Sequence, residues 1–581
     1  MNQKIQWFNN LVAIVLFMGF YACDSQNKKK EDINKNYLRS ELSIQEGMVL
    51  FNQNCANCHN FNNVEIGPNL GGITYEVDKE WIKKFIQSPQ KMIESGDERA
   101  VAQFEKFGVY MPSFAHLEDH DLENLLAFIH KLSQGEKRNK SNRPGGLINP
   151  IQESITKADH RLILEDFTTI PASSEIAPDT RINTMRTFTT AENSQRFFIS
   201  DLRGRLYEIV DQTPHLFLDL KSKFPSFIDS PGHATGFGSF AFHPEFENNG
   251  LLYTTHTEPA HSQPADFPLP EGVKITLQWV LMEWKAKNPQ DVIFKEESSR
   301  ELLRVDMLSQ AHGVQEVTFN PYASTDSSDY GLLFIGVGDG SLALSGHPDL
   351  CDSNKNIWSN VLRIDPLGSD SKNGKYGIPK DNPFINADGL DEIWCMGFRN
   401  PHRISWDAED PSRMFVSNIG QHSVEEVNLA EKAGHFGWPL REGTFVFDVN
   451  ANPEVVYPLT PKDLEASYIP PVAQYDHDEG NAVSGGFLYR GRQIPSLVGN
   501  YLFGDIARGT IFISPLAQAE NGQQYPVQKV DIVVNGKATS FTEIRPYEKA
   551  DLRFGQDSAG ELYVFTKSNG KVYRVVDYSK E

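Results

Sequence analysis

One short strand signature recurs six times between residues 196 and 565, and it limits how this chain can fold more than any other feature. Each copy has a turn residue, an apolar strand rich in aromatic residues, and then in most copies a small or acidic residue. The copies are Arg196–Asp201, Gly250–Thr255, Gly331–Gly336, Arg413–Asn418, Asn500–Asp505 and Gly560–Phe565. Three of them are followed by a second, glycine-led strand, at Gly204–Tyr207, Gly509–Phe512 and Gly570–Tyr573.

Successive copies start 54 to 87 residues apart, which leaves room for a four-stranded blade of about 40–50 residues plus loops. The spacing predicts an all-β six-bladed β-propeller over residues 160–577, with ligands bound at its central channel. A pair of β-sandwiches would not explain why one signature recurs across the whole region. The net charge of -22, without a cluster of basic residues, is not the charge pattern of a nucleic-acid-binding protein.

A smaller all-α domain is predicted before the propeller, over residues 43–135. Cys55-Ala56-Asn57-Cys58-His59 has the spacing of a haem c attachment site, where the thiols of Cys55 and Cys58 bind the haem covalently and His59 ligates the iron. Helical patterns over 44–54 and 122–132 flank this motif. Half a zinc site and a thioredoxin-like pair are the alternatives, but no second Cys-x-x-Cys accompanies the motif. The region resembles a small class I c-type cytochrome.

The sixth iron ligand is predicted to be Met111. The residue lies between a glycine-containing segment and Pro112, so it is expected in a loop from which its thioether can reach the iron. A His/Met ligand pair raises the haem potential into the range of an electron acceptor. Met92 is an alternative ligand or a core residue, and His116 and His120 lie in a more surface-like acidic turn.

The N-terminal 23 residues have the features of an export signal. Lys4 precedes an apolar stretch over 11–21, and Cys23 follows a small residue. This pattern resembles a bacterial lipoprotein signal in which Cys23 is lipidated, and the alternative is a plain signal peptide. The expected mature chain is exported to the periplasm or cell surface and anchored by lipid. Residues 24–42 are expected to form a flexible tether, and 136–159 a linker between the two domains.

Two cysteines, Cys351 and Cys395, are left outside these motifs. In an exported protein they could form a disulfide or remain two buried thiols, and their separation in sequence does not decide between the two.

Several segments of the predicted propeller resemble the soluble pyrroloquinoline quinone (PQQ)-dependent glucose/sorbosone dehydrogenases, a family of six-bladed propellers. They are 240–245, 311–313, 338–340, 376–384, 397–401, 419–428 and 434–439, of which Gly377-Ile-Pro-Lys-Asp-Asn-Pro-Phe384 and Phe398-Arg-Asn-Pro401 are the most specific. The resemblance implies PQQ and Ca²⁺ as cofactors. It implies that His312 removes the hydroxyl proton of the substrate and that Asp339 orients this histidine.

The same resemblance assigns the remaining site residues. Arg399 and Asn400 match residues that hold the quinone, and a guanidinium suits a tricarboxylate anion. Gly420 and Gln421 match the positions whose backbone carbonyls bind Ca²⁺. Arg508 could add positive charge near the carboxylates, and Arg553 is a weaker candidate.

Three positions depart from the family pattern. Ala507 stands where a lysine grips the quinone, Ala234 where a glutamine contacts it, and Ala311 where an acid often precedes the base. Arg508 or His233 could substitute for the lost contacts. Because of these departures, cofactor retention is a question that the sequence leaves open.

Taken together, the sequence predicts a quinohaemoprotein dehydrogenase. It would oxidise a sugar or other alcohol or aldehyde at the propeller and pass electrons through one covalent haem c to an external respiratory acceptor, because a reduced quinone needs re-oxidation. The first alternative is a propeller without a quinone that binds a carbohydrate or a protein beside an electron-transfer cytochrome, since hedgehog-interacting relatives share the fold without dehydrogenase activity. A second alternative is a non-quinone oxidation in the propeller channel.

Overall fold

The computed structural model describes residues 37–580, apart from 57, 62–65, 108–109, 134–142, 176–177, 191, 193, 231–233 and 545–548. The predicted export signal with Cys23, most of the predicted tether, and His233 therefore lie outside the described residues. The chain divides into two compact units, one helical and one built of strands, and each is described by itself. None of the helices in the described ranges has both the length and the apolar character needed to cross a bilayer.

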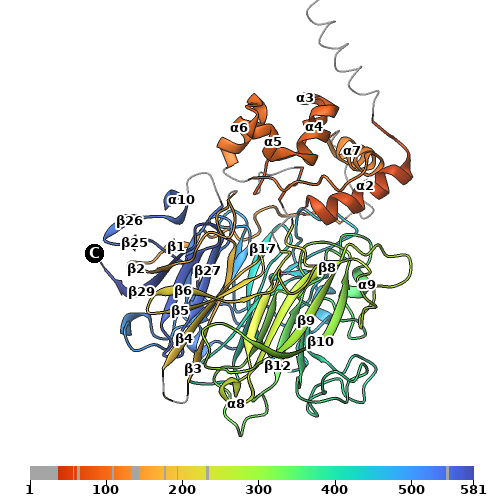
Figure 1. Cartoon of the computed structure of the whole chain (residues 1–581). Helices are drawn as coiled ribbons and strands as arrows, with labels where there is room; N and C mark the ends of the chain where they lie inside the picture. Colours follow the sequence, from red (N-terminus) through yellow and green to blue (C-terminus); the bar gives the residue numbers. More distant parts are fainter. Residues whose placement is uncertain are drawn as a thin grey trace, which may run out of the picture. The chain divides into compact units, whose positions relative to one another are not determined.

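The helical unit carries the predicted haem motif and is coloured red to orange in Figure 1. Its first and last helices match the two predicted from sequence, and shorter helices lie between them. The described helices are α2 (Glu41–Asn54), α3 (Ile73–Glu76), α4 (Lys79–Gln87), α5 (Pro89–Glu94), α6 (Glu98–Phe107) and α7 (Asp119–Ser133). Asp78 caps α4, because its carboxylate accepts the N–H groups of Glu80 and Trp81.

The helices α2 and α7 pack directly against each other at Gly47. A Cβ atom at this position would lie 1.8 Å from the backbone oxygen of Asn124, so only glycine allows the two backbones to approach this closely. One turn further on, the rings of Phe51 and Phe128 are in contact with centroids 5.3 Å apart. This contact brings the segment after α2, which contains the cysteines, against the last helix.

The second unit is a β-propeller, confirming the predicted fold. In the described part of the chain its strands form six main sheets with four core strands each, mostly consecutive antiparallel meanders. The first three blades contain β3 (Ile182–Thr189), β4 (Gln195–Asp201), β5 (Arg205–Val210) and β6 (Thr213–Asp219); β7 (Ser239–Phe242), β8 (Leu251–Pro259), β9 (Leu277–Ala286) and β10 (Glu296–Met307); and β11 (Glu316–Phe319), β12 (Leu333–Val337), β13 (Asn360–Ile364) and β14 (Ile393–Met396).

Of the last three blades, the fifth and sixth have additional strands, and each includes a strand from the N-terminal end of this unit. They contain β15 (Pro401–Trp406), β16 (Met414–Asn418), β17 (Val424–Ala430) and β20 (Ala473–Asp476); β21 (Val483–Leu488), β22 (Tyr501–Asp505), β23 (Ile511–Ser514) and β24 (Gln528–Val530), with β1 (Thr156–Lys157) at the edge; and β27 (Leu552–Gln556), β28 (Leu562–Thr566), β29 (Lys571–Ser579) and β2 (Arg161–Thr169), extended by β25 (Ile532–Val534) and β26 (Lys537–Thr539).

Short elements lie in the loops between these strands. They are α8 (Phe246–Asn249), α9 (Pro348–Cys351), α10 (Phe541–Ile544), the hairpin β18 (Arg441–Glu442) and β19 (Phe445–Val446), and the 3₁₀ turns η1 (Asp463–Glu465), η2 (Pro495–Leu497) and η3 (Leu516–Gln518). The long insertion between β17 and β20 contains the β18–β19 hairpin, which is important for the site described below.

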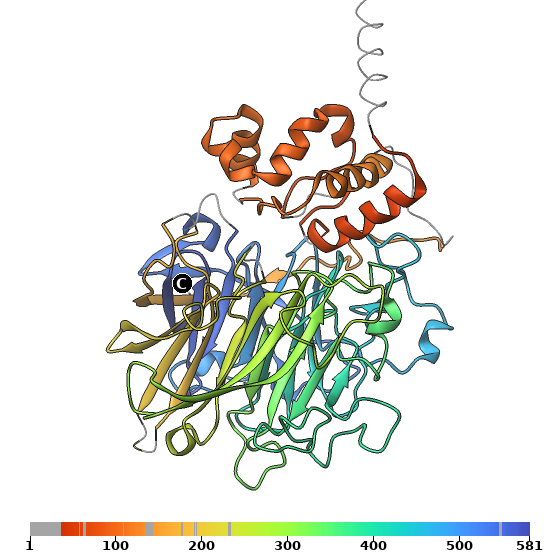
Figure 2. The same cartoon turned by 45° about the vertical axis from the view of Figure 1, so that its right-hand side comes forward.

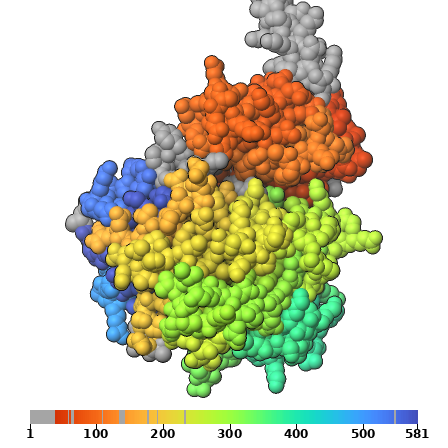
Figure 3. All heavy atoms as spheres, in the orientation of Figure 1, coloured from red at the N-terminus to blue at the C-terminus, as the bar shows by residue number. Residues whose placement is uncertain are grey.

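The first strand of each blade faces the centre, and these strands form a closed ring. Contacts run from β3 to β7, β11, β15, β21 and β27 and back to β3. The ring is closed at the outside by backbone hydrogen bonds, because β2 from the N-terminal end of the propeller pairs antiparallel with β29 from its C-terminal end. Figures 1 and 2 show the blades side by side, and in Figure 3 the orange start and the blue end of this unit lie next to each other on the surface.

Every copy of the recurring signature forms the second strand of its blade. The copies correspond to β4, β8, β12, β16, β22 and β28, and the following glycine-led strands to β5, β23 and β29. The central strands of a blade are covered on both faces by neighbouring blades, so they are rich in apolar and aromatic residues. The rings of Phe198 and Phe242, from consecutive blades, are an example, with centroids 4.5 Å apart.

The propeller makes contacts with the chain before the predicted boundary at residue 160. Leu147 forms a β-bridge with Val456, the N–H of Ile151 donates to the Asp476 carboxylate at 2.9 Å, and β1 pairs in parallel with β24. Backbone hydrogen bonds to the blades therefore hold much of the segment predicted as a linker.

Cys351 and Cys395 are two free, fully buried thiols. Cys351 packs in the apolar core around Trp279 and Trp358, whereas Cys395 packs in a different cluster around Phe398 and Trp406. Burial raises the pKa of both thiols. The possibility of a disulfide is therefore excluded by their positions.

Replacing Gly47 by alanine tests the contact between α2 and α7. Helix propensity alone would stabilise α2 by about 1 kcal/mol, but the clash with Asn124 is expected to destabilise the helical unit by about 1–3 kcal/mol. Chemical unfolding followed by circular dichroism at 222 nm measures this unit, because the propeller has little helix. Gln45→Ala, at an exposed position of the same helix, is the control and should stabilise; a gain in stability for Gly47→Ala would contradict the contact.

Candidate active site at the end of the central channel

The loops that precede the inner strands bring the predicted catalytic residues together. The six inner strands are each the first strand of a blade, so they run in the same direction and their N-terminal ends lie at one end of the channel. His312 lies four residues before β11, Arg399 lies two residues before β15, and Asp339 follows β12. All three side chains are buried.

His312 and Asp339 form a hydrogen-bonded pair. The Nδ1 atom of His312 lies 2.8 Å from Oδ1 of Asp339, and the same oxygen accepts the N–H of Ser341 at 2.9 Å. The backbone N–H of Asp339 donates to the carbonyl of Arg399 at 2.8 Å. The pair is thereby fixed to the residue that was predicted to hold the quinone.

Close backbone packing holds His312 in an unusual conformation. Its φ angle is 52°, in the left-handed region that costs energy for residues other than glycine. Gly338 makes the necessary room, because a Cβ there would lie 2.3 Å from the carbonyl oxygen of His312. Gly313, the next residue, also has to be small, because a Cβ there would lie 1.8 Å from the indole nitrogen of Trp279.

The electrostatic surroundings make His312 a neutral base. Burial lowers the pKa of His312 below its ordinary value, and the charge of Arg399 lowers it further against the opposing effect of Asp339. Burial tends to raise the pKa of Asp339, but the hydrogen bond and charge of His312 and the nearby Arg399 outweigh it, so this pKa is lowered. At neutral pH the imidazole therefore carries its proton on Nδ1, towards the ionised Asp339, and Nε2 is the basic nitrogen.

Arg399 is tied to the two residues predicted to bind calcium. Its Nε donates to the Gln421 side-chain oxygen at 2.7 Å, and its Nη1 donates to the Gly420 carbonyl at 2.5 Å. The backbone N–H of Asn400 donates to the side chain of Asn418 at 2.9 Å. The structure thus brings His312, Asp339, Arg399, Asn400, Gly420 and Gln421 into one site.

One residue that the sequence analysis missed holds the loop that contains Gly420 and Gln421. Glu442, on the β18–β19 hairpin, is 2% exposed. Its Oε1 atom accepts four consecutive backbone N–H groups, those of residues 421–424, at 2.8–3.0 Å. Burial raises the pKa of Glu442, although these donors, His477 and Arg399 oppose the rise. Its Oε2 atom is buried and has no hydrogen-bond partner among the described residues.

Further buried acids lie beside this loop. Glu425 bonds His477 at 3.0 Å through one oxygen and accepts the N–H of Gly420 at 3.3 Å through the other. Burial raises the pKa of Glu426 to about 7, against hydrogen bonds from Asn418 and Asn428. Three buried acids thus lie beside this loop, and a bound cation would favour their ionised forms.

The donor set of this loop suits a hard cation such as Ca²⁺, which prefers oxygen ligands including backbone carbonyls. Within the described ranges, no group of three or more His, Cys, Asp or Glu side chains is arranged as a metal site. A cation here would depend on backbone oxygens such as that of Gly420. The buried amide nitrogen of Gln421 has no hydrogen-bond partner in the described part of the chain, which also fits a polar ligand at this place.

Arg508 lies differently from the other predicted quinone ligands. It is exposed, and its guanidinium bonds the carbonyls of Asp478 and His477 at 2.5 and 2.8 Å. It therefore holds the loop around His477 together. At the departing position Ala234, the backbone oxygen accepts the side-chain amide of Gln315 at 3.0 Å, so a glutamine from a neighbouring blade is present there.

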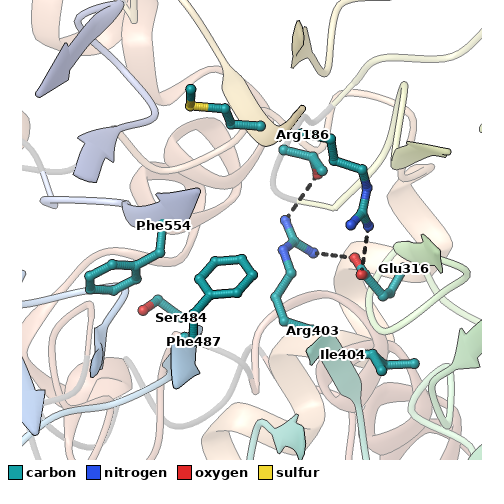
Figure 4. Close-up of a pocket in the computed structure, with 10 residues that line it drawn as sticks. Arg186, Glu316, Arg403, Ile404, Ser484, Phe487 and Phe554 are labelled. Carbon is teal, nitrogen blue, oxygen red and sulfur yellow. Dashed lines mark hydrogen bonds and ion pairs between the residues drawn. The ribbon is translucent and has the colours of Figure 1, made fainter. Parts of the chain in front are cut away.

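Figure 4 shows an ion-pair network between side chains of three inner strands, β3, β11 and β15. The Glu316 carboxylate lies 2.7 Å from Arg186 and 3.6 Å from Arg403. A cavity of about 20 Å³ adjoins these residues and is also lined by Phe487 and Phe554, enough space for one water molecule.

In the helical unit, the haem motif has the surroundings that an iron ligand needs. The Nδ1 atom of His59 lies 2.9 Å from the Pro68 carbonyl, so Nδ1 donates and Nε2 is left for iron. Gly67 lies directly against the imidazole, since a Cβ there would be 2.3 Å from its Cε1 atom. Cys55 is buried and Cys58 half-buried.

The candidates for the sixth ligand differ in their positions. Met111 is half-buried in the irregular segment between α6 and α7, whereas Met92 is 3% exposed within α5. His116 and His120 are exposed. Met111 stays the predicted ligand.

Comparison with known proteins agrees with these two units. The family model for glucose/sorbosone dehydrogenases matches residues 185–574. The chain belongs to this family. The cytochrome c family model matches residues 44–133, so this glucose/sorbosone dehydrogenase propeller is preceded by a cytochrome c domain in the same chain.

Three relatives with different names are each 25–27% identical to this chain. The HIPL1 protein of Arabidopsis thaliana is 26% identical over 447 residues, covering 67% of this chain and 61% of its own length. The human Hedgehog-interacting protein is 27% identical over 404 residues, covering 67% of this chain and 50% of its own. Quinoprotein glucose dehydrogenase B of Acinetobacter calcoaceticus is 25% identical over 221 residues, covering 37% of this chain and 42% of its own. The chain thus spans less than two thirds of the length of each of these relatives.

Replacing Glu442 tests whether its carboxylate holds the loop that contains Gly420 and Gln421. Glu442→Ala leaves four buried N–H groups without their acceptor, so the propeller is expected to lose about 3 kcal/mol or more of unfolding free energy. Glu442→Gln keeps an acceptor oxygen and should lose less. Glu465→Ala, at an exposed acid of the same insertion, should change stability by no more than about 0.5 kcal/mol. Equal unfolding free energies for all three variants, measured in denaturant, would refute this role of Glu442.

Proposed function

We propose that this protein is a PQQ- and Ca²⁺-dependent dehydrogenase that oxidises a sugar or other alcohol or aldehyde and passes the electrons through haem c to an external acceptor. The observation that carries the proposal is the buried His312–Asp339 pair, held by a backbone hydrogen bond to Arg399 at the end of the channel. The family membership and the relative named as a quinoprotein dehydrogenase support it.

In this proposal His312 is the general base. Its neutral Nε2 takes the proton of the substrate hydroxyl, while Asp339 holds the ring orientation and stabilises the imidazolium that forms. The lowered pKa of His312 keeps the base deprotonated at neutral pH. When bound, PQQ supplies the acceptor for the two electrons of the substrate C–H bond, and Ca²⁺ polarises it.

Other residues of the chain would bind and orient the cofactors. Arg399 supplies a buried guanidinium for carboxylates, and Asn400 lies beside it. The carbonyls of Gly420 and Gln421 would hold Ca²⁺, supported by the negative charge of Glu425 and Glu442. Arg508 would contribute positive charge only at the exposed rim.

The presence of the propeller and the cytochrome c domain in one chain supports electron transfer to the haem. Oxidation of one hydroxyl releases two electrons and two protons, and one haem accepts one electron at a time, so two successive haem reductions re-oxidise the site. A covalent connection gives the haem a high effective concentration at the propeller. Cys55 and Cys58 would hold the haem, with His59 and Met111 as axial ligands.

We further propose that the protein acts outside the cytoplasm, anchored by a lipid on Cys23 and delivering electrons to a respiratory acceptor. The sequence around Cys23 and the haem c motif support this placement, because both are features of exported bacterial proteins.

A propeller that binds a carbohydrate or a protein without a quinone is the second candidate. The match to the human Hedgehog-interacting protein covers more of this chain than the match to the quinoprotein, and its name describes binding. In that case the protein would catalyse no oxidation, and His312 would not act as a base.

Replacing His312 by alanine distinguishes the two. With PQQ and Ca²⁺ added, substrate-dependent turnover should fall at least about 10²–10⁴-fold because the general base is lost, while dithionite should still reduce the haem fully. His215→Ala, at an exposed histidine of β6, should leave turnover unchanged. Turnover of the His312 variant equal to that of the unmodified protein would disprove its role as the base.

A further inference from the structure

Ser309 and Ser341 are two buried serines whose hydroxyls are hydrogen-bonded to each other. Their exposed fractions are 1% and 5%, and their Oγ atoms lie 3.0 Å apart. Ser309 stands three residues before the base His312, and Ser341 stands two residues after Asp339. The hydroxyl pair therefore joins the loop before β11 to the loop after β12, the two loops that contain the proposed base and the acid that orients it.

Each serine also bonds the backbone or side chain next to the catalytic pair. The backbone N–H of Ala311 donates to Oγ of Ser309 at 3.1 Å. In the other loop, the backbone N–H of Ser341 donates to Oδ1 of Asp339 at 2.9 Å, and the same oxygen lies 2.8 Å from Nδ1 of His312. The contacts thus form a closed ring through residues 309, 311, 312, 339 and 341.

The capacity of the two hydroxyls indicates which one donates. A serine hydroxyl has one proton and two acceptor lone pairs. Ser309 accepts the N–H of Ala311, and its own proton faces the Ala311 carbonyl at 3.4 Å, so one lone pair is left for Ser341. With Ser341 as the donor, the proton and both lone pairs of the buried Ser309 hydroxyl are satisfied.

The backbone of Ser341 has a conformation that favours glycine. The carbonyl of Asp339 accepts the N–H of Leu342 at 2.9 Å, which closes a turn whose central residues, Gly340 and Ser341, have φ angles of 55° and 66°. Positive φ at both central positions of a turn is typical of Gly, Asn and Asp. Serine at this position is therefore strained, and strain of this kind gathers at functional sites.

The backbone hydrogen bonds between the two loops are long. The nitrogen of Gly340 lies 3.3 Å from the carbonyl oxygen of His312, and the nitrogen of Gly338 lies 3.3 Å from that of Gly313. N–H···O bonds in proteins are most often about 2.9–3.0 Å. The hydroxyl pair, at 3.0 Å, is thus a shorter connection between the loops than either backbone bond.

We propose that Ser309 and Ser341 are positioning residues that hold the Asp339 carboxylate against the His312 ring. The inference rests on the proposed function and deepens it, because it names the contact by which this chain fixes its general base. Without the hydroxyl bond the two loops can shift, and a small displacement of a base from the reacting hydroxyl lowers the rate strongly. Neither serine is assigned a contact with the substrate, so substrate binding should be unaffected.

The first measurement is NMR of the haem-loaded full chain with isotope-labelled histidine nitrogens, without PQQ or substrate. The His312 signals are assigned by their absence in His312→Ala. In the unmodified protein His312 should carry its proton on Nδ1, towards Asp339. Ser341→Gly and Ser309→Ala should each increase the fraction of His312 that carries its proton on Nε2, because Asp339 then orients the ring less firmly.

The matched control is Ser345→Ala, in the same loop as Ser341. The Ser345 hydroxyl is also buried but has no hydrogen-bond partner among the described residues. This variant should keep the protonation of His312 and the kcat of the unmodified protein.

The second measurement is turnover with PQQ and Ca²⁺ added. Ser341→Gly and Ser309→Ala should each lower kcat about 10- to 100-fold with KM unchanged. The double variant should lose no more than either single variant, because all three lack the same bond. Ser341→Gly should lower Tm less than Ser309→Ala, since glycine adopts the positive φ without strain while Ser309→Ala leaves the Ala311 N–H without its acceptor.

The outcomes separate this inference from the proposed function. Unchanged protonation of His312 in both serine variants overturns the inference, and a lower Tm without that change assigns the serines a structural role. Changed protonation with unchanged kcat also overturns it, while the proposed function stands. If the unmodified protein turns over no substrate, the proposed function fails, and the NMR result alone supports or refutes the positioning of His312.

Discussion

The pairing of β2 with β29 closes the ring on which the site depends. Without this antiparallel pair the sixth blade would lack its outer core strand, and the inner strands from β3 to β27 would not be held in a closed circle. Closure brings the starts of six strands, hundreds of residues apart in sequence, to one end of the channel. Residues as far apart in sequence as Arg186 and Arg403 can contact the same Glu316 only because of this arrangement.

The site that results brings buried charges of both signs together. On one side, the loop of residues 419–424 is fixed by Glu442 and bordered by Glu425 and Glu426, an environment suited to a cation. On the other, Arg403 and Arg553 pair with Glu316 and Asp551. Arg399 and the His312–Asp339 pair lie between these two groups of interactions, because Arg399 bonds Gly420 and Gln421 and accepts a hydrogen bond from Asp339.

The sequence was informative where the chemistry is local. The haem motif is five consecutive residues, and the recurring signature identifies the second strand of every blade because a strand covered on both faces must be apolar. The pairing of His312 with Asp339 was expected only from the family resemblance. Glu442 was missed because its partners lie about 20 residues away across an irregular insertion. The state of Cys351 and Cys395 likewise depends on which core each joins.

The most direct test of the account is haem reduction driven by substrate in the intact chain. The haem-loaded protein is mixed with PQQ and Ca²⁺, and the absorbance of reduced haem is followed during exposure to a panel of sugars and alcohols. The account predicts substrate-dependent reduction that requires both additions, with two haems reduced per substrate oxidised when protein is in excess. No reduction with any substrate, together with no PQQ binding by calorimetry, would contradict it and leave the propeller as a binding module.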